Sequence, residues 1–178
     1  MTRLDKASSI ALIMASVLFI GNLGRNYYLS RIPDPTINPD IKEGELVRLP
    51  GGASADRQPA SANLVMALSI HCVFCQTSVP FYQKLAAFKN SSPARMRLTI
   101  VMPESKEEIE AYLKKHGIAA DAIFSMPVSQ IGVNGTPTLL LLDGQNKLAK
   151  SWVGRLNGSQ ESEVTAHLQK VCPTCSAQ

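Results

Sequence analysis

A pair of cysteines separated by two residues, Cys72-Val73-Phe74-Cys75, constrains this chain of 178 residues more than any other feature. The pair follows an apolar run over residues 64–70 and opens a segment with helical spacing of apolar residues. Backbone amides and the positive dipole end at a helix start stabilise a thiolate. Two cysteines at this spacing can also form a disulfide across the first helical turn. The pattern therefore predicts a reversible redox pair where a strand meets a helix.

Apolar runs alternate with amphipathic segments between residues 41 and 171. Continuous apolar runs are typical of buried strands of a parallel sheet. We predict strands at residues 45–49, 64–70, 97–102, 122–126, 138–142 and 148–153. The last two read as a hairpin that turns at Asp143-Gly144. This alternation predicts an α/β layer structure with a mixed sheet. Such folds place their chemistry at the carboxyl ends of strands, which is where the cysteine pair lies.

Three helices are predicted from apolar residues that recur every three or four positions. The first follows the cysteine pair and ends at residues 90–93. The second begins with a capping box of Ser105 and Glu108 and ends at Gly117. The third is capped by Ser159. The residues expected to face the core are Phe81, Leu85, Phe88, Ile109, Tyr112, Leu113, Val164, Leu168 and Val171.

The amino-terminal region contains an uncharged segment over residues 7–24, which is just long enough to span a bilayer. Residues 20–25 form a poor cleavage site, so we favour an uncleaved anchor over a cleaved secretory signal. A buried helix of a soluble domain is the third interpretation. Arg3 and Lys6 favour a cytoplasmic amino terminus at residues 1–6, although Arg25 and Arg31 beyond the segment weaken that preference.

An anchor or a signal would place the remainder of the chain outside the cytoplasm. The proline-containing segment 25–40 is then a linker, residues 41–171 a compact domain and residues 172–178 a tail. Four cysteines fit an oxidising compartment. The net charge of +4 is not gathered into a basic face with interleaved aromatic residues, so nucleic acid is not an expected partner.

A second motif, Gly135-Thr136-Pro137-Thr138, stands just before the strand at residues 138–142. Together with the cysteine pair, it resembles the cis-proline loop of the thioredoxin superfamily. Pro80, where these proteins kink their first helix, and Gly154, after the last strand, agree with the resemblance, which covers about residues 41–171. The strand–helix–strand insert and the anchor resemble the membrane-anchored TlpA/redoxin branch. The implied fold is thioredoxin-like, a central mixed sheet flanked by helices, with an amino-terminal transmembrane helix.

The resemblance implies a thiol-disulfide oxidoreductase that acts on protein thiols and disulfides. Cys72, at the helix start, is the expected nucleophile, and Cys75, one turn further in, is the expected resolving cysteine. Thr136 and Pro137 are expected to bind the substrate, with Pro137 in the cis form; an ordinary trans turn is the interpretation without the cysteine pair. The branch also implies a membrane electron donor or acceptor. Nothing in the sequence requires a cofactor or a metal.

Departures from the family concern the residues around the sulfurs. His71, Val73 and Phe74 are candidates for tuning the pair, so the redox potential cannot be copied from the family. A protonated His71 would favour the thiolate, but an exposed rim residue is an equal alternative. Met66 occupies the position of the family's buried acid. Glu104 is a candidate substitute, although a solvated residue before a helix is the favoured interpretation.

Two other functions fit parts of the pattern. A peroxiredoxin-type peroxidase needs a proline, a hydroxyl residue and a cysteine at fixed spacing; Ser69 fits, but Val65 stands at the proline position. A non-catalytic scaffold with a structural disulfide between Cys72 and Cys75 is the alternative from another class. The presence of both motifs argues against it.

A second pair, Cys172-Pro-Thr-Cys175, lies at the end of the chain with no helix after it. We favour a local tail disulfide; an accessory redox pair that exchanges with the first pair and unpaired thiols are the alternatives. The spacer between the pairs is far longer than in ordinary zinc modules, which argues against a shared zinc site. His116 and His167 are expected at the surface, and Trp152 in packing.

Overall fold

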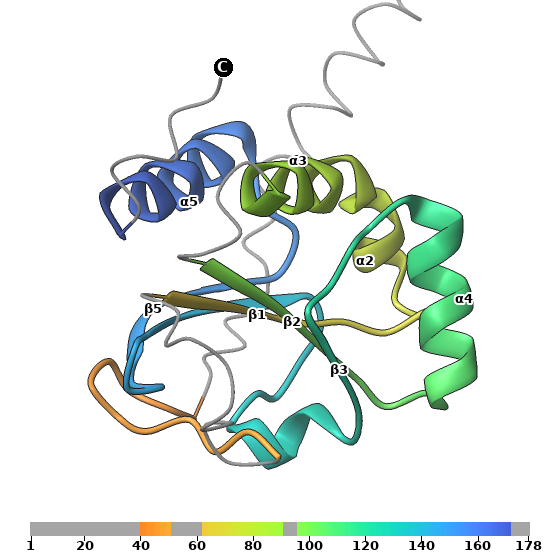
Figure 1. The fold of residues 1–178 in the computed structure, drawn as a ribbon, viewed down its shortest axis with the longest axis horizontal. Helices are drawn as coiled ribbons and strands as arrows, with labels where there is room; N and C mark the ends of the chain where they lie inside the picture. Colours follow the sequence, from red (N-terminus) through yellow and green to blue (C-terminus); the bar gives the residue numbers. More distant parts are fainter. Residues whose placement is uncertain (1–39, 51–61, 91–95, 172–178) are drawn as a thin grey trace, which may run out of the picture. The chain divides into compact units, whose positions relative to one another are not determined.

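The computed structural model describes residues 40–50, 62–90 and 96–171. Within these residues one sheet has the strand order β3-β2-β1-β4-β5 (Figure 1). The strands are β1 Ala62–Ala67, β2 Met96–Met102, β3 Ala122–Ser125, β4 Thr138–Asp143 and β5 Leu148–Val153. β1, β2 and β3 are parallel, whereas β4 runs antiparallel to β1 and β5 antiparallel to β4. The mixed sheet predicted from the alternation is confirmed.

Helices join and follow these strands. They are α2 Val73–Thr77, α3 Val79–Asn90, α4 Lys106–His116 and α5 Gly158–Val171, with a 3-10 helix, η1, at Val128–Ile131. α3 and α4 are the crossovers between the parallel strands, and both pack with α5 against the same core cluster (Figure 1). The opposite face of the sheet is covered by residues 40–50 and η1.

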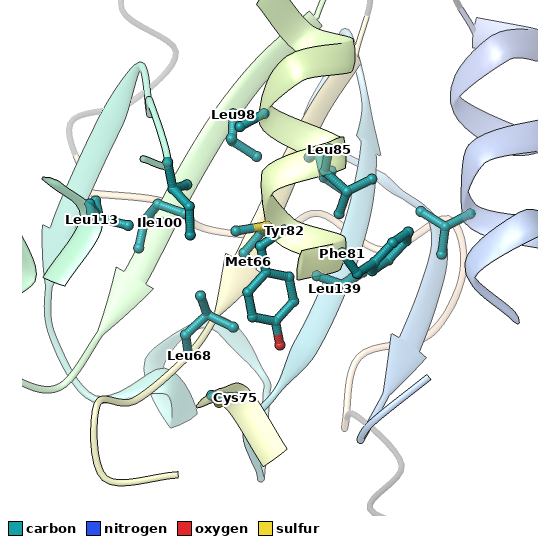
Figure 2. Close-up of a cluster of buried hydrophobic side chains, with 14 of the residues drawn as sticks. Met66, Leu68, Cys75, Phe81, Tyr82, Leu85, Leu98, Ile100, Leu113 and Leu139 are labelled. Atoms are coloured by element: carbon teal, nitrogen blue, oxygen red, sulfur yellow. The ribbon is translucent and has the colours of Figure 1, made fainter. Parts of the chain in front are cut away.

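The alternation of side chains along the strands produces two cores, one on each face of the sheet. Leu64 and Met66 of β1 belong to the cluster under α3, α4 and α5, which Figure 2 shows in close-up. Val65 and Ala67 belong to the cluster on the other face. β1 is buried on both faces because it lies at the centre of the sheet, which explains its continuous apolar run.

The helix predictions agree with the structure at most positions. Ser105 and Glu108 form the reciprocal capping box, and Gly117 ends α4 with a left-handed φ of 64°. The helix after the cysteine pair is interrupted at Ser78, where α2 ends and α3 begins one residue before Pro80. Proline lacks the N–H that a continuous helix would use, so the kink predicted from Pro80 is confirmed. The predicted inward residues of α3, α4 and α5 are buried, with Phe88 half-buried; the side chain of Val171 lies outside the described residues.

Two local predictions are wrong. The strand expected at residues 45–49 is only an isolated bridge between Leu46 and Lys147, because this segment pairs with the turn between β4 and β5. The third helix is capped by Asn157 rather than Ser159. The Asn157 side-chain oxygen accepts a hydrogen bond from the Gln160 amide at 3.0 Å, and the Gln160 side chain accepts one from the Asn157 amide. Ser159 only donates to the capping oxygen.

The membrane predictions concern residues outside the described ranges. The predicted anchor at residues 7–24, nearly all of the linker and the tail lie there. Among the residues that the structure does describe, none of the helices combines the length and the apolar character that crossing a bilayer requires. The domain boundaries stay predictions.

Candidate active site

Cys72 lies at the N-cap of α2, five residues after β1 ends at Ala67. Its backbone is extended, with φ −84° and ψ 114°, so the sulfur turns back over the first helical turn. The Cys72 Sγ accepts a hydrogen bond from the Cys75 amide at 3.2 Å, and its thiol is 3.2 Å from the carbonyl oxygen of Thr136. The side chain is half-buried. The first sulfur is thus within reach of solvent and already surrounded by polar backbone groups.

Cys75 has the opposite environment. It is completely buried in the core under α3 (Figure 2). Both thiols are free. An approaching disulfide can therefore meet Cys72 but not Cys75. This geometry leaves one sulfur accessible to another molecule and the other sulfur behind it.

The two thiols also differ in acidity. Burial opposes ionisation of Cys72, but hydrogen bonds from the Cys75 thiol, the Thr136 side chain and nearby backbone amides outweigh it and bring the pKa of Cys72 below the ordinary thiol value. Burial raises the pKa of Cys75 far above that value, and the hydrogen bond to Cys72 raises it further. These effects follow from which form each environment stabilises. Of the two thiols, Cys72 is therefore the one that ionises more readily.

The Thr136–Pro137 loop lies beside the sulfurs although it is 64 residues further along the chain than Cys72. The peptide bond between Thr136 and Pro137 is cis, which confirms that prediction. The Pro137 carbonyl oxygen accepts a hydrogen bond from the Gly154 amide at 2.8 Å. Gly154 has a φ of 79°, a left-handed conformation that glycine adopts readily. The glycine after β5 thus holds the loop in place.

The side chains predicted to tune the pair form the rim of the site. His71 is exposed, and its amide donates to the Ser69 hydroxyl at 3.2 Å. Val73 and Phe74 are 67% and 48% exposed, which is unusual for large apolar residues. Their tuning role stays a prediction. Their exposure next to Cys72 provides an apolar surface at the mouth of the site.

Glu104 is the clearest correction to the sequence analysis, which favoured a solvated residue. Its side chain is buried, with 9% of its surface exposed. Oε1 accepts hydrogen bonds from the Ser69 hydroxyl at 2.6 Å and from the Ile70 amide at 2.9 Å. Oε2 is buried and has no hydrogen-bond partner among the described residues. A carboxylate therefore supports the loop that carries the cysteine pair from below.

Tyr112 was predicted only as a core residue, and no role was predicted for Tyr82 from the sequence. Burial raises the pKa of both phenols, that of Tyr112 to about 12, and the charge of a Cys75 thiolate would raise them further. Both hydroxyls are buried without a hydrogen-bond partner in the described part of the chain. Figure 2 shows the Tyr82 hydroxyl directed toward the part of the core that holds Cys75. Sequence patterns identify a helix face as apolar but not the position of a hydroxyl at its edge.

Other predicted residues have ordinary structural roles. Trp152 is buried in packing, with its ring edge toward His167 at a centroid distance of 5.6 Å. His116 is half-buried and its ring contacts Tyr112. Met66 is buried in the core and confirms that no carboxylate occupies that position of β1. Cys172 and Cys175 lie outside the described residues. Within residues 40–50, 62–90 and 96–171 no three potential ligand side chains gather into a metal site.

The fold of the described domain is similar to that of several solved thiol-disulfide exchange proteins. A putative protein disulfide isomerase from Bacteroides thetaiotaomicron is similar with a TM-score of 0.56 and 18% identity, over 74% of this chain and 91% of that one. A putative thiol:disulfide interchange protein DsbE from Chlorobium tepidum gives 0.54 and 17%, over 74% and 98%. A putative thioredoxin from Neisseria meningitidis gives 0.53 and 17%, over 68% and 80%.

These similarities, with the sheet order and the site, establish that the chain has the thioredoxin-like fold. No protein-family model matches the sequence, and the curated proteins give no match either. The predicted fold class is confirmed for the described domain.

Proposed function

We propose that this protein is a thiol-disulfide oxidoreductase that exchanges disulfides with cysteine pairs of other proteins. The observation that carries the proposal is the asymmetry of the two sulfurs beside the Thr136–Pro137 loop. Cys72 is accessible and has a lowered pKa, whereas Cys75 is buried and has a raised pKa. A structural disulfide requires neither difference.

In the reducing direction the Cys72 thiolate attacks one sulfur of a partner disulfide. A mixed disulfide forms, and the partner's other sulfur leaves as a thiolate. Cys75 then loses its proton and attacks the Cys72 sulfur, so that the Cys72–Cys75 disulfide forms and the partner's first sulfur leaves. The pair loses two electrons and the partner disulfide gains two. The reverse sequence oxidises a partner dithiol.

The mouth of the site is suited to an extended segment of a partner protein. Val73 and Phe74 offer apolar contact on one side of Cys72, and the backbone of Thr136 offers polar groups on the other. In this proposal, Thr136 and Pro137 position the partner strand while its cysteine reaches Cys72. Neither a cofactor nor a metal takes part in the exchange.

The cellular setting is also part of the proposal. An anchor at residues 7–24 would hold the domain on the extracytoplasmic face of the cytoplasmic membrane, where a membrane electron donor or acceptor would reset the pair. Similar solved structures include a putative thiol:disulfide interchange protein and a putative protein disulfide isomerase, which supports the exchange chemistry that such a donor or acceptor would serve. Cys172 and Cys175 form a local tail disulfide in this account, with an accessory redox pair as the alternative.

A peroxidase is less well supported by the same site. The Ser69 hydroxyl, at the position where a peroxidase would polarise its substrate, donates its hydrogen to Glu104. Val65, at the position of the required proline, is buried on the other face of the sheet. No observation favours the scaffold alternative. A scaffold with a structural disulfide would not require the lowered pKa of Cys72.

An insulin reduction assay with dithiothreitol tests the proposal. The wild-type chain should accelerate the reaction, and Cys72→Ser should remove the acceleration. Cys172→Ser/Cys175→Ser separates the tail pair from the site: retained activity supports the local disulfide, and lost activity supports the relay. An inactive wild-type chain would favour the scaffold. A midpoint potential of about −270 mV for the Cys72–Cys75 couple would indicate a reductant, and one of about −120 mV an oxidant.

A further inference from the structure

Three buried polar atoms gather beneath the cysteine pair from three different elements. They are Glu104 Oε2 from the loop after β2, the Tyr112 hydroxyl from α4 and the Tyr82 hydroxyl from α3. Glu104 Oε2 and the Tyr112 hydroxyl have no hydrogen-bond partner among the described residues, and only the Ser78 side chain lies close to the Tyr82 hydroxyl. The three side chains are nine-tenths or more buried. Leaving such a group unpaired costs about 1–3 kcal/mol. Because such groups reduce the stability of the fold, their presence beneath the cysteine pair indicates a role in the reaction.

These groups are linked to Cys75 through contacts already described. Ser69 donates its hydroxyl to Glu104, and its backbone amide favours the thiolate of Cys75. Tyr112 lies close enough to both Cys75 and Glu104 for their charges to act on its phenol. Ser69 thus joins the Glu104 carboxylate to the loop beside Cys75, and Tyr112 lies within electrostatic range of both Cys75 and Glu104.

The exchange reaction needs a group near Cys75 that can accept its proton. Cys75 must lose a proton before it can attack, and its burial keeps bulk water away. β1 offers no carboxylate, because Met66 stands there. Among the described residues, the titratable groups that interact electrostatically with Cys75 are Cys72 from the α2 cap, Tyr82 from α3 and Tyr112 from α4. Glu104, in the β2–α4 loop, acts in turn on Tyr112. In the mixed disulfide Cys72 carries no charge, and phenols are poor bases near neutral pH.

We propose that Glu104 accepts the proton that Cys75 releases, and that the Tyr112 hydroxyl carries it between them. The inference rests on the proposed function. Oε1 of Glu104 is occupied by Ser69 and Ile70, so Oε2 receives the proton. The S–H bond of Cys75 breaks, the proton moves to Glu104, and the sulfur's electron pair forms the bond to Cys72 while the partner sulfur leaves with its bonding pair.

Rapid mixing with 5,5′-dithiobis(2-nitrobenzoate) separates the two steps. In a Cys172→Ser/Cys175→Ser background, attack by Cys72 releases one thionitrobenzoate, and attack by Cys75 on the mixed disulfide releases a second. Glu104→Gln keeps an oxygen that can accept from Ser69 and Ile70 but removes the base. Glu107→Gln is the matched control, because Glu107 is an exposed acid three residues away.

The first release should change less than about twofold in Glu104→Gln, whereas the second should slow about tenfold or more at pH 7, since a positioned base contributes about 10²–10⁴-fold. The deficit should shrink as hydroxide takes over at higher pH. Tyr112→Phe should slow the same step, and it tests the path independently if Glu104→Gln does not fold.

A second release that matches Glu107→Gln at every pH would overturn the inference. Equal slowing of both releases would also overturn it, because Glu104 would then act only by placing the loop. A wild-type chain that gives no second release would instead contradict the proposed function.

Discussion

The buried polar groups near the amino ends of the parallel strands differ in their hydrogen bonding from those near the carboxyl ends. At the amino ends the buried polar side chains of the described residues are paired. The Thr99 hydroxyl donates to the Asn63 side chain at 2.9 Å, and the Lys89 ammonium lies 2.6 Å from the Asp121 carboxylate. At the carboxyl ends Glu104 and Tyr112 keep polar atoms without partners in the described residues. Lys89, Thr99 and Asn63 are as buried as Glu104 and Tyr112, and only Asp121 is half-buried, so burial alone does not explain the difference.

The difference separates stability from chemistry. Paired buried groups cost little in the folded state but leave an expensive orphan when one partner is removed. Unpaired groups already cost stability, so their removal should be nearly free or favourable, while the reaction suffers. Opposite signs of the effects on stability and activity are therefore expected at the two ends.

The largest contrast should lie within the carboxyl end itself, between its two sulfurs. In the reduced protein, iodoacetamide at pH 7 should label Cys72 at least about 100-fold faster than Cys75, because only Cys72 is accessible and has a lowered pKa. As pH rises, labelling of Cys72 should level off before that of an ordinary thiol, and Cys75 should stay protonated. Mass spectrometry of the labelled peptides measures both rates. Equal rates would remove the asymmetry on which the proposed function depends.

The amino end should respond most strongly through its ion pair. Lys89→Met leaves the Asp121 carboxylate without its cation, and the free energy of unfolding should fall by about 2–3 kcal/mol, less than for a fully buried pair because Asp121 keeps some solvent contact. Urea unfolding measures the loss, and disulfide exchange should be unchanged. Lys84→Met, which breaks an exposed pair with Glu161, is the control and should cost less than about 1 kcal/mol.

A smaller loss is expected at the hydroxyl between β1 and β2. Thr99→Val keeps the shape of the side chain but leaves the Asn63 oxygen unpaired, so the free energy of unfolding should fall by about 1–2 kcal/mol. Adding Asn63→Leu should recover part of the loss, because no orphan then remains. A strictly additive double variant would show that the pair is not the cause.

The smallest change in stability is expected at Tyr112, and with the opposite tendency. Tyr112→Phe removes a buried hydroxyl that has no partner among the described residues, so the unfolding free energy should stay within about 0.5 kcal/mol or rise by up to about 1 kcal/mol. Urea unfolding of the reduced protein is the measurement. A loss as large as that of Thr99→Val would mean that the hydroxyl is paired in solution, and the contrast between the two ends would disappear.

Sequence patterns were sufficient wherever a single segment decides its own structure. The capping box at Ser105, the helix interruption near Pro80 and the buried run of β1 were all predicted, because neighbouring residues supply the hydrogen bonds or the periodicity. The misassigned cap shows the limit of this approach. Asn157 and Ser159 are both good capping residues, and the chain's path from β5 into α5 selects Asn157.

Glu104 shows a different limit. In the sequence it is an acid beside a capping residue, with nothing local to bury it. It is buried because β1 and β2 pair in parallel register, which brings the residues after the two strands, Ser69 and Glu104, to the same edge of the sheet. Both residues follow a predicted strand, and this shared position could have indicated that they lie close together. The sequence did not show that the two strands are neighbours in the sheet.

The amino-acid sequence by itself determined the order of strands and helices, the redox pair at a helix start and the resemblance carried by two short motifs, since each depends on residues close together in the chain. Only the tertiary structure decided which sulfur is buried, that Thr136 contacts Cys72 across 64 residues, and that a carboxylate and two phenols lie beneath the pair. The physical reason is that acidity and reactivity depend on burial and on hydrogen-bond partners. In this protein those partners come from segments that meet only when the sheet has formed.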